Sequence, residues 1–272
     1  MPSLRKIGLR RRLALIPAAV LVLIVIGVAA VVLTTSAASP EPLGIPGHWK
    51  LVLDSEFTGS SLNTSIWRAG WFGAGVTNSP GNEGVCQSSK NVTFPGDGTM
   101  HLNVTMTRST CQGGQTYPYT GALVSSDPQD GRSSGGFQFT YGVLQARVYV
   151  PASAAQIADW PAVWAAGQNL PRDGEDDIME GSTGQACYHF HDPLGGPGGC
   201  EPTLVPGGWH TFASDWQPGS VTYYYDGVKV GSITTGITNS PMFIILSNGG
   251  ATADTGIKRD SMQVKYVRVW QR

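Results

Sequence analysis

Segments in which apolar and polar residues alternate recur along the chain beyond its N-terminal part. The clearest spans 99–107, where Met100, Leu102, Val104 and Met106 alternate with Thr, His and Asn side chains. A period of two residues predicts a β-strand with one buried face and one wet face. We therefore expect these four side chains in a hydrophobic core.

Further segments have the same strand character, and they lie at 144–150, 221–225, 243–246 and 264–270. Asp226-Gly227, followed by Val228, predicts a hairpin turn, because this dipeptide tolerates positive φ. An amphipathic helical period is missing after residue 40, and 36 Gly and 18 Pro favour turns. The sequence predicts an all-β fold of two stacked antiparallel sheets.

The N-terminal part has a different pattern. Arginines at 10–12 precede an almost unbroken apolar run at 13–33, and small residues follow up to Ala38. This predicts either a signal peptide cleaved near Ala38 or a retained membrane anchor helix, residues 1–38 in both cases. The protein is then secreted, or anchored on the extracellular face by 13–33. The Pro-rich stretch 39–46 is expected to be a linker, and 47–272 one domain.

Charge narrows the possible partners. The net charge is −1, but all five basic residues before position 39 lack acidic counterparts, so 13 basic and 19 acidic residues remain, giving −6. A nucleic-acid partner is not expected, since phosphate contacts need a basic surface. Only 14% of residues are charged, which excludes helical bundles and coiled coils.

Cysteine usage agrees with export. The chain has four cysteines and no Cys-x-x-Cys pair: Cys86, Cys111, Cys187 and Cys200. In an exported protein they predict two disulfides, and sequence alone allows three connectivities or four separate buried thiols. We favour the local pairs Cys86–Cys111 and Cys187–Cys200, because each closes a short loop.

Four carboxylates crowd into one short segment, at Glu175, Asp176, Asp177 and Glu180, with no basic residue among them. On a strand, Glu175 and Asp177 share a face, and Glu180 joins them only if a bulge lies near Ile178-Met179. The alternative is an acidic surface patch, but the residues that flank this segment are apolar and aromatic. A nucleophile and a protonated acid about 5 to 5.5 Å apart suit retaining glycoside hydrolysis, since crowded carboxylates keep a proton.

Trp160 and Trp164 lie four residues apart upstream of this segment, hence on one face of an extended strand. They are candidates for stacking on sugar rings, and the alternative is a pair of core tryptophans.

The motif Glu-x-Asp-x-x-Glu, following Trp-Pro-Ala-x-Trp, resembles glycoside hydrolase family 16, the β-glucanase and laminarinase group of jelly-roll enzymes. Other segments resemble landmarks of that family: residues 51–57, 141–147, 209–212, 225–227 and 266–270. The resemblance covers 47–272. It implies a concanavalin-like jelly-roll β-sandwich that serves as a glycoside hydrolase catalytic domain.

The resemblance also implies roles: Glu175 as nucleophile, Glu180 as acid/base, and Asp177 holding the proton balance between them. It implies a monomeric, endo-acting, retaining hydrolase of β-1,3- or mixed-linked β-1,3/1,4-glucan, with a polysaccharide as its partner and no cofactor. The alternatives are a non-catalytic carbohydrate-binding protein of the same fold, a transglycosylase, or a galactan-active relative.

Three positions depart from the family pattern. Asp176 replaces an aliphatic residue and should face the other sheet, where a lone carboxylate is costly unless paired or exposed. Gln145 replaces a glutamate. Lys265 replaces an aspartate that in many members binds structural calcium, so we expect no calcium.

His189 and His191 lie two residues apart on what should be the next strand. Without a third ligand at a recognisable spacing, we expect no metal site. One histidine is expected to hydrogen-bond near the nucleophile or the substrate, and a structural role is the alternative. Asn82-Glu83 resembles a substrate-binding pair of the family.

Overall fold

The computed structural model describes residues 39–70, 76–78, 84–131, 133–250 and 260–272. These residues form one compact unit, which contains two large sheets. The first sheet has a main path of seven strands, with an eighth paired to β22: β20 (Val228–Ile233), β19 (Ser220–Tyr225), β18 (Gly208–Gln217), β11 (Gly142–Val150), β22 (Ser261–Gln271), β6 (Met100–Asn103), β5 (Val92–Thr93), and β1 (Lys50–Glu56) beside β22.

The second sheet has a main path of eight strands and two side strands: β17 (Gly198–Glu201), β16 (Ala186–His191), β15 (Glu175–Glu180), β14 (Trp160–Gly167), β21 (Met242–Gly249), β9 (Thr120–Ser125), β4 (Cys86–Ser88), β3 (Val76–Asn78), with β10 (Gln138–Phe139) beside β21 and β2 (Arg68–Ala69) beside β9. Its pairings are antiparallel except for β4 with β9. Small ribbons and one 3₁₀ turn complete the described elements: β7 (Ser109–Thr110), β8 (Thr116–Tyr117), β12 (Ala152–Ser153), β13 (Gln156–Ile157) and η1 (Ser89–Asn91).

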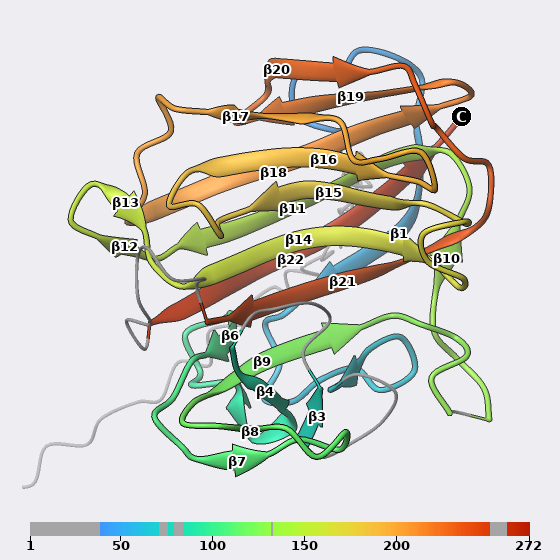
Figure 1. The fold of residues 1–272 in the computed structure, drawn as a ribbon. Coiled ribbons are helices and arrows are strands. Elements are labelled where there is room, and N and C mark those ends of the chain that lie inside the picture. Colours follow the sequence, from blue (N-terminus) through green and yellow to red (C-terminus); the bar gives the residue numbers. More distant parts are fainter. Residues whose placement is uncertain (1–38, 71–75, 79–83, 132, 251–259) are drawn as a thin grey trace, which may run out of the picture. The chain divides into compact units, whose positions relative to one another are not determined.

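The two sheets stack face to face, with β14, β15 and β16 lying over β11, β18 and β22 (Figure 1). Side chains from both sheets fill the space between them, among them Leu144 and Phe212 from one and Ile178 and Phe190 from the other. Burial of these alternating apolar residues is the main favourable term for such a sandwich. The predicted all-β sandwich is confirmed.

The predicted strands fall within β6, β11, β19, β21 and β22, with one correction. The strand at 99–107 is shorter than expected, because β6 ends at Asn103, and the Met106 side chain is 65% exposed rather than in the core. The Asp226-Gly227 turn between β19 and β20 has φ of 49° and 80°, as the dipeptide predicts.

Residues 39–46, expected to be a linker, pack on the outer face of the first sheet. Ile45 is buried with Val143 and Trp270, the Leu43 amide donates to Gln145 Oε1 at 2.8 Å, and Trp270 Nε1 donates to the Pro40 carbonyl. The segment 13–33 lies outside the described residues. Within the described ranges, no helix has the length and apolarity that a membrane crossing requires.

Both predicted disulfides are present, Cys86–Cys111 and Cys187–Cys200. The second one joins β16 to the edge strand β17, where the two cysteines face each other in register. It therefore ties down the edge of the sheet that carries the carboxylate segment.

Candidate active site

The carboxylate segment forms β15, between β14 and β16. Trp164 of β14 pairs with Asp177, but Val163 pairs with Met179, so one extra residue of β15 is bulged at the predicted place. The Tyr225 hydroxyl, from the opposite sheet, donates to the Ile178 carbonyl at 3.0 Å and so satisfies a backbone group within the bulge. The bulge brings Glu175, Asp177 and Glu180 to one face, where all three line the same small cavity.

A glycine sets the entry into β15. Gly174 has φ of +90°, and a Cβ atom there would lie 2.4 Å from Thr238 Oγ1. Only glycine fits this backbone conformation and this close approach. The chain can therefore turn from the preceding loop directly into Glu175.

Glu180 is held by one hydrogen-bonding partner from each neighbouring strand. Trp160 Nε1 of β14 donates to Glu180 Oε1 at 3.2 Å, and His189 Nδ1 of β16 lies 3.0 Å from Glu180 Oε2. Each carboxylate oxygen has its own partner, so the group has a fixed orientation toward the cavity.

Asp177 lies between the two glutamates and is almost fully buried. Among the described residues, its one ion-pair partner is His191, whose Nε2 is 3.1 Å from Asp177 Oδ2. Burial raises the pKa of Asp177 well above its ordinary value, and the charges of Glu180, Glu175 and Asp176 raise it further. Burial also raises the pKa of Glu175; His191 opposes that rise and Glu180 adds to it. The site is therefore built to retain a proton.

Asp176 points to the other side of β15, into the space between the sheets, and is 2% exposed. The Ser214 hydroxyl donates to Asp176 Oδ2 at 2.7 Å, and the Tyr223 hydroxyl donates to Oδ1 at 2.8 Å. Burial raises the pKa of Asp176 to about 6, and these two hydrogen bonds limit the rise. The carboxylate is thus buried but hydrogen-bonded, and these bonds reduce the free-energy cost expected for an unpaired buried carboxylate.

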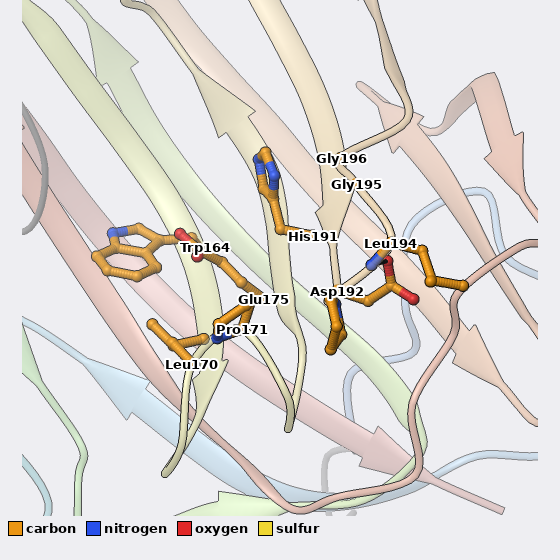
Figure 2. A pocket seen from close by; sticks show the side chains of 10 residues that line it. Trp164, Leu170, Pro171, Glu175, His191, Asp192, Leu194, Gly195 and Gly196 are labelled. Carbon is orange, nitrogen blue, oxygen red and sulfur yellow. Dashed lines mark hydrogen bonds between the residues drawn. The ribbon is translucent and has the colours of Figure 1, made fainter.

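A larger cleft of about 760 Å³ opens from Glu175 away from Glu180. Figure 2 shows Trp164 and Glu175 on one side of it and His191 and the loop from Asp192 to Gly196 on the other. The described residues that line it include no lysine or arginine. A cleft with two carboxylates and no cation in its described lining disfavours an anionic ligand.

The two tryptophans lie on one face of β14, as expected, but differ in exposure. Trp164 is 5% exposed, donates to Ser247 Oγ at 3.2 Å and packs with Leu123 and Phe243. Trp160 is half-buried and borders the cavity of the three carboxylates. Asn82 and Glu83 lie outside the described residues.

One group of side chains has the composition of a metal site. Asp177, His189 and His191 each offer a ligand atom within 4.8 Å of the other two. Asp177 is thus a third potential ligand that the spacing along the sequence does not reveal. Each of the three already has a partner in the site, because His191 forms an ion pair with Asp177 and His189 hydrogen-bonds with Glu180.

Gln145 and Lys265, the other two positions that differ from the family pattern, lie away from the cleft face of β15. Gln145 accepts a hydrogen bond from Leu43 and donates to the Tyr266 hydroxyl at 3.0 Å, so it fastens the N-terminal segment to β11 and β22. Lys265 Nζ donates to the Gly98 carbonyl at 3.3 Å.

Sequence reasoning did not find Ser214, Tyr223 or Ser247, which contact the carboxylate segment or its tryptophan. Each comes from a strand far away in the chain, and nothing near it in the sequence marks it. The alternation of β19 does place Tyr223 on the buried face, but only the stacking of the sheets selects Asp176 as its partner.

The fold and this site define a jelly-roll sandwich with a carboxylate-lined cleft. The same fold occurs in an endo-β-1,3-glucanase from Pyrococcus furiosus, at 24% identity over 82% of this chain and 94% of that chain, with a TM-score of 0.65. The laminarinase catalytic domain from Thermotoga petrophila RKU-1 is similar at 24% identity over 82% and 98%, with a TM-score of 0.66. A non-specific endo-β-1,3(4)-glucanase from family GH16 is similar at 23% identity over 85% and 94%, with a TM-score of 0.69.

No family model matches the sequence, and no curated protein matches it. Another structural neighbour, 23% identical with a TM-score of 0.66, comes from work on endo-acting O-glycanases of the human gut microbiota that initiate mucin breakdown. The expected jelly-roll fold is therefore confirmed, whereas the substrate does not follow from the fold alone.

Proposed function

We propose that the protein is an endo-acting, retaining glycoside hydrolase that cleaves β-1,3- or mixed-linked β-1,3/1,4-glucan. One observation carries the proposal. Glu175 and Glu180 share a face of β15 with a buried Asp177 between them, and Trp160 and His189 orient Glu180. Two carboxyl groups with a proton held between them are what a double displacement requires.

In the proposed mechanism, Glu175 attacks the anomeric carbon while Glu180 protonates the leaving glycosidic oxygen. Glu180 then removes a proton from water, which attacks the glycosyl-enzyme and releases Glu175. The proton on Asp177 lowers the repulsion that Glu175 meets in its ionised form. Two inversions at the anomeric carbon return the β configuration.

The lining of the cleft supports a neutral substrate. The chain beyond residue 38 carries −6, and Glu175 and Asp192 line the cleft without a lysine or arginine among its described residues. Sulfate or uronate groups would meet repulsion there. Trp160 and Trp164 are the aromatic candidates for contact with sugar rings.

The experiment uses the purified full-length chain with laminarin, lichenan, agarose and carrageenan, and measures new reducing ends and, by NMR, the first anomer formed. Release from laminarin or lichenan with the β anomer first is the expected result. Binding without release would indicate a carbohydrate-binding protein, and cleavage of carrageenan or agarose alone a galactan-active enzyme. New linkages without new reducing ends would indicate a transglycosylase.

We also propose that the domain acts outside the cytoplasm as a monomer, secreted or held by residues 13–33. The two disulfides support export, because such bonds persist in oxidising compartments. Cell fractionation with N-terminal sequencing of the mature protein tests this. A mature N-terminus near residue 39 indicates secretion, and an intact one in the membrane fraction indicates anchoring.

A further inference from the structure

Asp176 is a buried ionisable group that the proposed mechanism does not use. Its neighbour two residues along, Ile178, occupies the same core-facing side of β15 and is fully buried, as expected for that side. A carboxylate there destabilises the folded chain, because burial favours its protonated form. A side chain that destabilises the folded state and lies next to a candidate active site indicates a role other than stability.

The contacts of Asp176 lead back to that site. The Tyr223 hydroxyl lies 2.8 Å from Asp176 Oδ1 and 3.0 Å from the His189 carbonyl oxygen, so it joins β15 to the backbone of β16 from the core side. On the other side of β16, the His189 imidazole contacts Glu180. Tyr188 stacks on the Tyr223 ring, with centroids 4.4 Å apart, and limits its movement.

We propose that Asp176 is a positioning residue: through Tyr223 it fixes His189, and hence the imidazole that orients Glu180, and its charge lies directly behind Asp177. This inference rests on the proposed hydrolase function. It concerns residues of the opposite sheet acting through β15 and β16 rather than groups that touch the substrate.

The groups that face Asp176 are Ser214 from β18 and Tyr223 and Tyr225 from β19, and Asp177 lies next to it on the cleft side of the same strand. None of these is a cation, so the charge of Asp176 acts on its surroundings without a neutralising partner among them. The charge of Asp176 helps to raise the pKa of Asp177. Without that charge, Asp177 should lose its proton at lower pH.

The test compares Asp176→Asn, Tyr223→Phe and Ser214→Ala in the full-length chain. Asp176→Asn should lower kcat on laminarin by about 10-fold with KM changed less than about twofold, and should move the pH–activity profile toward acid. Tyr223→Phe should lower kcat similarly. Ser214→Ala, which removes a hydrogen bond from Asp176 but leaves the Tyr223–His189 contact, should have the smallest effect.

Two readouts do not depend on activity. At fixed pH, the NMR signal of the His189 ring Cε1–H should move in Tyr223→Phe and stay in place in Ser214→Ala. The Tm of Asp176→Asn should exceed that of the wild type increasingly as pH rises from about 4 to about 6, because burial raises the folded pKa of Asp176 to about 6: the cost of the charge grows between the ordinary pKa and that value and is complete above it.

The outcomes separate the two proposals. If the wild type cleaves glucan but Asp176→Asn keeps its kcat and pH profile, the positioning role is wrong and the hydrolase function stands. If the wild type cleaves no polysaccharide, the function fails, and an unmoved His189 signal in Tyr223→Phe overturns the positioning role as well, whereas a moved signal retains it. If Asp176→Asn does not fold, Tyr223→Phe and Ser214→Ala decide.

Discussion

The two outer faces of the sandwich differ in the partners of their carboxylates. On the outer face of the first sheet, Arg268 of β22 contacts the carboxylates of Asp54 and Glu56 from β1 and lies 4.1 Å over the Tyr266 ring. On the cleft face of the second sheet, the ion pairs that the described residues give to Asp177 and Glu180 come only from histidines.

The difference separates charges that contribute a little stability from charges that cost stability. Exposed arginine–carboxylate pairs contribute only about 0 to 1 kcal/mol each to the stability of the fold. Crowded carboxylates that share no arginine or lysine raise one another's pKa, and such perturbed groups cluster at functional sites. The first and last predictions change opposite faces, and the two between them compare a change near the cleft with a matched change elsewhere in the chain.

The largest effect is expected on the cleft face. Glu175→Gln and Glu180→Gln should each lower kcat by at least about a thousandfold, because a nucleophile and an acid/base are both required. Azide should restore turnover of an activated substrate only in a Glu180→Ala variant, where it replaces the activated water. Glu56→Gln on the outer face should keep wild-type kcat. Near-normal activity of either cleft variant would refute the assigned roles.

Removal of either disulfide should lower stability, but only one of the two removals should lower activity. Replacing Cys86 and Cys111 together by Ala should cost about 3.5 kcal/mol of unfolding free energy, and replacing Cys187 and Cys200 about 3, because the loops differ in length, with separations of 25 and 13 residues. Only the second change should also lower kcat, since Cys187 pairs with Glu180 across β15 and β16. Denaturant unfolding and kinetics measure the two effects; equal losses of kcat would contradict this.

A smaller effect should appear in the pH profile of His191→Ala. The positive charge of His191 lowers the pKa of Glu175, so its removal should raise that pKa and move the acidic limb of kcat/KM to higher pH. His210→Ala is the matched control, because His210 contacts Asp226 at the turn after β19. An acidic limb that stays in place in His191→Ala would show that Glu175 does not set it.

The smallest effect is expected for Arg268→Ala. Loss of its exposed pairs with Asp54 and Glu56 should change the unfolding free energy by less than about 1 kcal/mol and leave kcat unchanged. Thermal unfolding at low and high salt measures it. A loss of activity would mean that the outer face influences the cleft.

Much of this protein follows from local patterns in the sequence. Alternation predicts β11, β19 and β22, because a strand with one buried face needs apolar residues at every second position. The chemistry of Asp-Gly predicts the turn at 226–227. The order of the four carboxylates even predicts the bulge at Ile178-Met179, since without it Glu180 would face the core. Short loop lengths led to the correct disulfide pairs.

The sequence alone did not determine which distant groups meet. Met106 continues the alternation of β6 but lies beyond the end of the pairing and is exposed. Asp177 joins His189 and His191 only through the register of β15 and β16, and Asp176 finds Ser214 and Tyr223 only because the two sheets stack. Strand pattern fixes the face on which a side chain lies, because that depends on local backbone geometry. Register and stacking fix its partner, because they depend on contacts between segments far apart in the chain.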